Sequence, residues 1–166
     1  FQGEKMTTIK DFQKILAMES KIIQEQTRDL THADSLMQPQ PAGNCLNWVL
    51  GHLITSQLAI IAAIGGVPPF NIELVARYER DSDPIHGEEP GVLNLSELLE
   101  MLEQVNTRVD NLLGSLDEND FFREIQIGER KMTLGWRIFF LHFHYTYHIG
   151  QLEYLRQLAG KLDKVL

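Results

Sequence analysis

The sequence predicts an all-α protein, a four-helix bundle with a long crossover between its second and third helices. Two observations lead to this prediction. Apolar residues recur at helical spacing in four segments of roughly twenty residues, and segments rich in turn-forming residues separate them. The chain has 166 residues, which suits one domain around a single core. We assign residues 4–166 to one helical domain and interpret residues 1–3 as the remnant of a cleavable tag.

The first helix is predicted to begin after Thr7 or Thr8, either of which is a good N-cap, and to end near Leu30. No glycine or proline interrupts this segment. Residues 32–43 contain two prolines and a glycine, which stop a helix and impose an extended or turning path. We expect a loop there that includes a short turn.

The second helix is predicted to begin at Asn44, as its N-cap, and to end before Gly65. Its apolar residues point in nearly every direction, so we expect it to be buried on two sides. This surplus predicts a homodimer with the helix in or near the interface. The alternative is that the crossover folds over the same surface. The residues in question are Leu46, Leu50, Leu53, Ile60, Ile61 and Ile64.

The crossover comprises residues 70–91, a charged segment with prolines and glycines in which residues 71–80 can form one or two helical turns. Asn94 and Glu97 then make a capping box that opens the third helix, which ends near Leu116. Residues 123–134 alternate in polarity and predict a small hairpin or an extended loop. Thr133 caps the fourth helix, which ends near Ala159.

The charge of the chain argues against nucleic acid as a partner. Fifteen basic residues against 23 acidic ones give a net charge of −8, the wrong sign for binding phosphate backbones. The single cysteine, Cys45, excludes an internal disulfide and fits a reducing compartment. We expect no apolar run of the ~18 to 20 residues that span a bilayer. The expected protein is cytoplasmic and binds neither nucleic acid nor membranes.

Two histidines in the fourth helix are the main candidates for chemistry. His144 and His148 are four residues apart, so their side chains lie one above the other on one helix face and can converge on one metal ion. His142 points elsewhere, because a step of two residues turns it well around the helix. The alternative is a histidine pair at the edge of the core that only bonds to its neighbours.

A third ligand is needed, and His52 is the one ionisable side chain in an otherwise uncharged second helix. Adjacent helices lie about 8 to 10 Å apart, so imidazoles from two of them can meet on one ion. Cys45 precedes His52 by seven residues and lies about 10.5 Å away along the helix, too far for both to bind one ion.

Two motifs resemble those of a known family. They are NWVLGHL at residues 47–53 and HYTYHIGQLEYLR at residues 144–156, and together they resemble the DinB/YfiT-like family of metalloenzymes. In that family the histidine of the Gly-His-Leu motif and the two of the His-x-x-x-His pair form a metal-binding triad. The resemblance therefore implies that His52, His144 and His148 bind a metal ion.

Three imidazoles leave at least one coordination position open, whereas structural zinc sites are usually closed by four protein ligands. Zinc is the first metal to expect, although imidazole also suits nickel, copper and iron. Gln151, one turn past His148, is a candidate to orient an imidazole or a bound water; the alternative is a polar residue at the helix edge. No carboxylate is assigned as a general base, but Glu19 and Glu25 are candidates if they face the site. A fourth protein ligand, such as Glu19, Glu25 or His86, would close the site.

Members of the family with an assigned function include transferases and isomerases that use low-molecular-weight thiols. The resemblance thus implies a metal-dependent enzyme acting on a small molecule, such as a thiol-dependent S-transferase or isomerase, or a hydrolase. The alternative is a non-catalytic helical bundle that binds metal, a small molecule or a protein and acts as an interaction module.

Overall fold

The structure is a computed structural model that describes residues 8–165. It is mostly helical, which confirms the all-α class. The expectations for the tag remnant and for Thr7 lie outside the described residues. The helices are α1 (Ile9–Thr27), α2 (His32–Ser35), α3 (Leu46–Ile64), α4 (Leu95–Gly114) and α5 (Leu134–Leu158), with 3-10 helices η1 (Ile72–Tyr78) and η2 (Asp120–Phe122), and the strands are β1 (Glu124–Ile127) and β2 (Arg130–Thr133).

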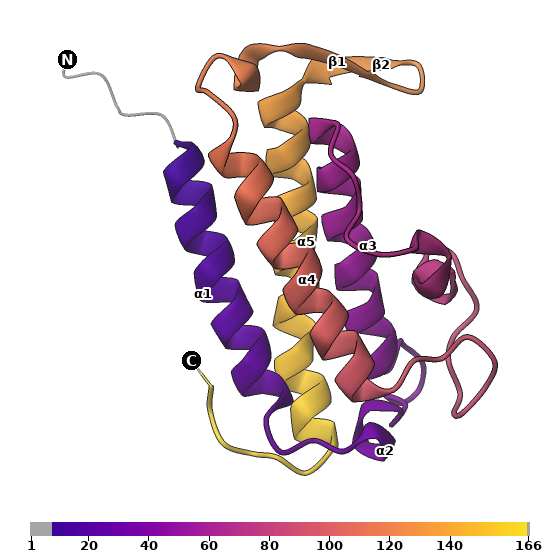
Figure 1. Ribbon diagram of the computed structural model, residues 1–166. Helices are drawn as coiled ribbons and strands as arrows, with labels where there is room; N and C mark the ends of the chain where they lie inside the picture. The colour runs from indigo at the N-terminus through magenta and orange to yellow at the C-terminus, as the bar shows by residue number, and fades with distance from the viewer. Residues whose placement is uncertain (1–7, 166) are drawn as a thin grey trace.

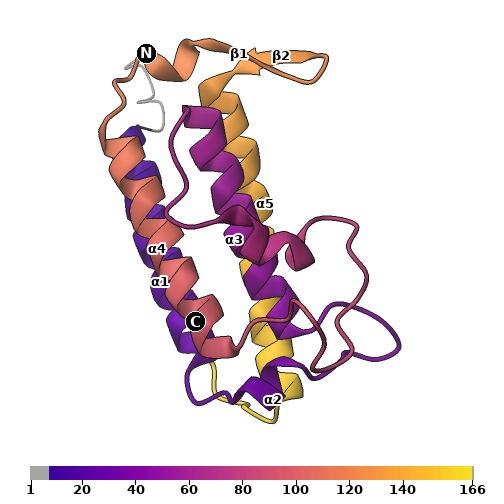
Figure 2. The same ribbon diagram turned by 45° about the vertical axis from the view of Figure 1, so that its right-hand side comes forward.

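The four long helices lie side by side (Figure 1). Helix α1 packs against α4 and α5, and α3 packs against the same two helices. The β1–β2 hairpin lies at one end of the molecule and α2 at the other (Figure 1). The crossover between α3 and α4 runs over the outside of α3, where η1 packs (Figure 2). Side chains from all four long helices form the core.

Three of the four predicted caps are confirmed. The side chains of Thr8, Asn94 and Thr133 accept backbone N–H groups at the starts of α1, α4 and α5. The predicted cap of α3 is wrong, because Cys45, not Asn44, is its N-cap and offers no side-chain hydrogen bond. The first helical bond runs from the N–H of Val49 to the carbonyl of Cys45, which places the helix start one residue later.

The two short predicted elements outside the long helices are confirmed. Residues 124–133 form an antiparallel hairpin in which Ile127 pairs with Arg130 around a tight turn. Gly128 in that turn has a φ of 58°, a conformation that glycine adopts without a steric penalty. The helical turns expected at residues 71–80 are η1.

Helix α3 is apolar on all sides and is buried on more than one of them. Its Leu46, Leu50, Leu53, Ile60 and Ile61 are all at most 1% exposed. The structure shows the alternative to a dimer interface, in which the crossover folds over α3. Helices η1, α4 and α5 together cover α3. The homodimer stays a prediction, but its original reason is lost.

By length and composition, α3 does qualify as a membrane span. It passes that test by length and composition alone, although we expected no apolar segment of this length. However, 67% of its apolar window is buried inside the fold, so it is no clear membrane span. A helix that must be covered on several sides by protein acquires the same apolar composition as one covered by lipid.

Candidate metal centre

The three predicted histidines lie together between α3 and α5. One ring nitrogen from each of His52, His144 and His148 lies within 4.8 Å of the other two. The Nε2 atoms of His144 and His148 are 3.2 Å apart. Two nitrogens bound to one tetrahedral zinc ion at about 2.0 to 2.1 Å are separated by roughly 3.3 Å, so this pair already has the spacing of two ligands.

Each ring also has a partner at its other nitrogen. Nδ1 of His52 lies 2.9 Å from the carbonyl oxygen of Tyr78, which can only accept, so this nitrogen carries the proton. Nδ1 of His148 lies 2.8 Å from Oε1 of Gln151, which also accepts. Gln151, the candidate to orient an imidazole, therefore lies in contact with one. Such partners fix both the tautomer and the orientation of a metal-binding histidine.

The third ring is fixed by a serine on the facing helix. Ser56 donates its hydroxyl proton to the carbonyl of His52 at 2.9 Å, and its oxygen lies 3.3 Å from Nδ1 of His144. The oxygen can therefore accept the Nδ1 proton of His144. With protons at their Nδ1 atoms, His144 and His148 both present Nε2 lone pairs, 3.2 Å apart, which a shared cation would stabilise.

A bound proton is disfavoured as that cation, because the pKa values of His144 and His52 are both lowered. Burial and the neighbouring His148 and His52 lower the pKa of His144 to about 4. Burial is also the main cause of a lowered pKa at His52. Both groups are therefore neutral at pH 7, which is the form that binds a metal ion. The donor set and its protonation fit a divalent metal.

The NWVLGHL motif positions His52 through its packing. The Trp48 ring stacks on His52 with centroids 4.6 Å apart and an interplanar angle of 17°. A Cβ at Gly51 would lie 2.1 Å from the Tyr78 ring, so only glycine lets η1 approach α3 this closely. Asn47 accepts a hydrogen bond from the Tyr78 hydroxyl at 3.0 Å. The motif thus holds η1, whose carbonyl orients His52.

The site is open on one side. His52 is buried, while His144 and His148 are only partly buried. The His148 ring lies beside the exposed Tyr147, with ring centroids 5.4 Å apart. Part of the cluster is therefore exposed to solvent.

The other candidates do not join this cluster among residues 8–165. Cys45 is buried at the start of α3, as expected for a small apolar residue. Glu25 is bound to Arg28 at 2.6 Å, and His86 lies in the crossover beside a separate hollow. Glu19 and His142 face each other elsewhere, with Oε2 and Nδ1 3.5 Å apart.

The contact between Glu19 and His142 is a buried polar pair that the sequence did not reveal. Thr146 donates to Oε1 of Glu19 at 2.6 Å, but Oε2 of Glu19 and Nδ1 of His142 have no hydrogen-bond partner in the described chain. Burial raises the pKa of Glu19 to about 7, and burial lowers the pKa of His142. His142 is therefore partly buried beside Glu19, and it does not belong to the histidine cluster.

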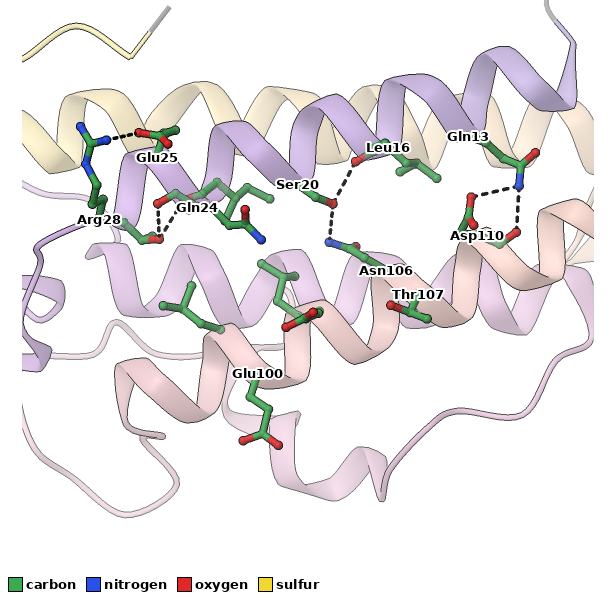
Figure 3. A pocket seen from close by; sticks show the side chains of 16 residues that line it. Gln13, Leu16, Ser20, Gln24, Glu25, Arg28, Glu100, Asn106, Thr107 and Asp110 are labelled. Carbon is green, nitrogen blue, oxygen red and sulfur yellow. Dashed lines mark hydrogen bonds and ion pairs between the residues drawn. The ribbon is translucent and has the colours of Figure 1, made fainter.

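A separate groove of about 890 Å³ lies between α1 and α4 (Figure 3). Hydrogen bonds cross it from Gln13 to Asp110 at 3.0 Å and from Asn106 to Ser20 at 3.2 Å. No histidine or cysteine lines it. Its side chains bond to one another and offer no convergent metal-binding or nucleophilic group.

The fold and the cluster define a helical protein with a three-histidine candidate metal centre. Residues 21–152 match the DinB superfamily, so the chain belongs to that superfamily. The expected resemblance is thereby confirmed. Proteins of this superfamily are typically metal-binding. A comparison with curated proteins found no significant match.

Among solved structures, the chain is similar to the crystal structure of a conserved protein from Enterococcus faecalis. The two share 17% sequence identity and superpose with a TM-score of 0.72. The match covers 95% of this chain and 98% of that one. At this identity the similarity supports the fold alone.

Proposed function

We propose that the protein is a metal-dependent enzyme on a four-helix bundle, in which His52, His144 and His148 bind one divalent ion. Zinc is the first candidate, with nickel or iron as alternatives. The observation that carries the proposal is the convergence of one ring nitrogen from each of the three histidines, all of which have a partner at Nδ1. We place the protein in the cytoplasm, consistent with its single buried cysteine.

The reaction we propose is activation of a low-molecular-weight thiol for transfer or isomerisation of a small molecule. A bound divalent ion would lower the pKa of a coordinated thiol or water toward neutrality. Three protein ligands leave a coordination position for it, and no carboxylate of the described chain closes the cluster.

The residues around the cluster would hold it in one geometry. Tyr78, Ser56 and Gln151 each fix one imidazole through Nδ1. Trp48 covers one face of the His52 ring and keeps water from it. The partly buried side at His144 and His148 admits the small molecule. The chain therefore supplies orientation and access, and the thiol supplies the nucleophile.

Cobalt substitution tests this proposal. The visible spectrum of the cobalt-loaded protein should change on addition of azide and of a small thiol, because both occupy the open position. The alcohol analogue of the thiol is the matched control and should cause a much smaller change. A response to azide but not to thiol would contradict the thiol chemistry. No response to either would show a closed site and favour a non-catalytic metal-binding module.

A further inference from the structure

Helix α5 carries a stripe of exposed aromatic side chains along its outer face. The stripe consists of Trp136, Phe140, Phe143, Tyr147 and Tyr154, with Phe139 stacked on Trp136 beside it. Each of these side chains is between 49% and 62% exposed. Their steps of three and four residues place them on one helix face, which is the spacing of a helix that packs against another helix. No other element of the described chain covers this face.

Gly150 occupies the one place in the stripe that has no ring. A Cβ at this position would meet no atom of the rest of the described chain within 4 Å. Glycine lowers the stability of a helix interior relative to alanine. No contact within a single copy of the described chain requires a glycine at this position. The space above Gly150 is open in a single copy of the protein and can accept a large side chain from outside.

We propose that this stripe is the interface of a homodimer in which α5 of one copy packs antiparallel against α5 of a second copy. The stripe is complementary to itself about its midpoint at residue 145. An antiparallel pair centred there matches Phe143 with Tyr147, Phe140 with Gly150, and Trp136 with Tyr154. The ring of Phe140 then fills the space above Gly150 in the second copy. A two-fold axis makes each of these contacts twice, as in most homodimers.

The area of the stripe suits such a dimer. Half-exposed aromatic side chains in this number offer on the order of 700 Å² of surface per copy. That value lies above the roughly 300 to 600 Å² of the largest apolar patch on a typical monomer. It approaches the roughly 800 Å² per partner of a standard interface. The stripe is about 27 Å long and contains no charged residue, so the two acidic copies meet along an uncharged line.

A second copy explains the stripe better than a membrane does. The net charge of −8 opposes approach to an anionic lipid surface. A membrane also gives no reason for the glycine or for the match of residues about a midpoint. The dimer has a consequence for the metal centre, because the Tyr147 ring lies edge-on to His148, with an angle of 84°. The second copy therefore forms part of the surface beside that site.

Sedimentation equilibrium of the full chain at micromolar concentration and about 0.15 M salt tests the dimer. The protein should be a dimer, and Phe143→Glu should weaken association roughly 100-fold or more, since each dimer carries the change twice. Phe143 is 62% exposed, so the variant should keep its helical circular dichroism. Met18→Glu, at a 55% exposed apolar residue of α1, is the control and should remain dimeric. A monomeric wild type, or a dimeric Phe143→Glu, would overturn the proposal.

Disulfide trapping tests the antiparallel arrangement. The double variant Trp136→Cys/Tyr154→Cys should form a covalent dimer on mild oxidation, because each new cysteine faces the other type in the second copy. The two positions are about 27 Å apart on one helix, so they cannot bond within a chain. Tyr154→Cys alone should not cross-link, and native Cys45 is buried. A covalent dimer of Tyr154→Cys alone, or none from the double variant, would contradict the antiparallel pairing.

Discussion

At the scale of single residues, the protons on the three imidazoles determine what the cluster can bind. The outward nitrogens lie beside a carbonyl, an amide oxygen and a hydroxyl. A proton on each of them leaves the inward nitrogens of His52, His144 and His148 free to bind a metal ion. Spacing of the histidines in the sequence predicted that they could meet. The sequence spacing could not predict the partners Tyr78 and Ser56. These contacts depend on the path of the crossover and on which sides of α3 and α5 face each other.

Glu19 is the residue with the clearest effect on stability. Its pKa rises from 4.5 to about 7 through burial, which means that the folded protein holds this proton more tightly than the unfolded chain does. The free energy of unfolding should therefore fall as the pH rises from about 4.5 to about 7, and the full loss should be present above that range. Neutral His142, whose pKa is lowered by burial, gives no compensating charge.

Glu19→Gln should remove this dependence while keeping an oxygen for the Thr146 hydroxyl. We expect the drop in unfolding free energy between pH 5 and pH 8 to be smaller by about 2 kcal/mol in the variant than in the wild type. Urea unfolding of both proteins in a chelator measures it. Because the two proteins differ only at this side chain, equal drops would show that Glu19 does not hold a proton in the fold.

At the scale of elements, the contact between η1 and α3 connects the fold to the site. The Tyr78 ring lies against the backbone at Gly51, its hydroxyl bonds to Asn47, and its carbonyl orients His52. The hydroxyl also accepts the N–H of Leu93 at 2.7 Å, which fixes the end of the crossover. A segment that looked like a linker in the sequence is therefore part of the metal centre.

Gly51→Ala should disturb both the fold and the site. The added methyl group would lie 2.1 Å from the Tyr78 ring, so η1 must move away from α3. Overpacking of this kind typically costs about 1 to 3 kcal/mol of unfolding free energy. Gly114→Ala is the control, because its Cβ would meet only the end of the Gln13 side chain, at 3.4 Å. Urea unfolding should show a loss for the first variant and none for the second; equal stability would contradict the role of Gly51.

The helices themselves were largely predictable from the sequence, and the reason differs from element to element. Thr8, Asn94 and Thr133 cap their helices as expected, because a side-chain oxygen just before an apolar repeat can accept a free backbone N–H of the first helical turn. The start of α3 was misplaced because Asn44 is the better N-cap by composition, whereas the helix begins one residue later, after Cys45. The apolar surplus of α3 was read correctly, but how it is covered depends on tertiary structure.

At the scale of the whole molecule, the two helices with the specific motifs are neighbours, and the chain between them reaches the site from outside through η1. The fold is shared with a protein at 17% identity, so the helical frame tolerates extensive change. The pair of Glu19 and His142 lies apart from the cluster. The groove between α1 and α4 is lined by neither histidine nor cysteine. The three histidines remain the one convergent metal-binding group in the described residues.

Zinc titration of metal-free protein without a histidine tag, followed by calorimetry, tests the central claim most directly. The wild type should bind one ion per chain, and His148→Ala should bind it at least about 100-fold more weakly, because two imidazoles remain. His142→Ala, which alters the same helix but lies outside the cluster, should bind as the wild type does once its folding is verified. Wild-type affinity in His148→Ala, or an equal loss in His142→Ala, would contradict the assignment of the metal centre.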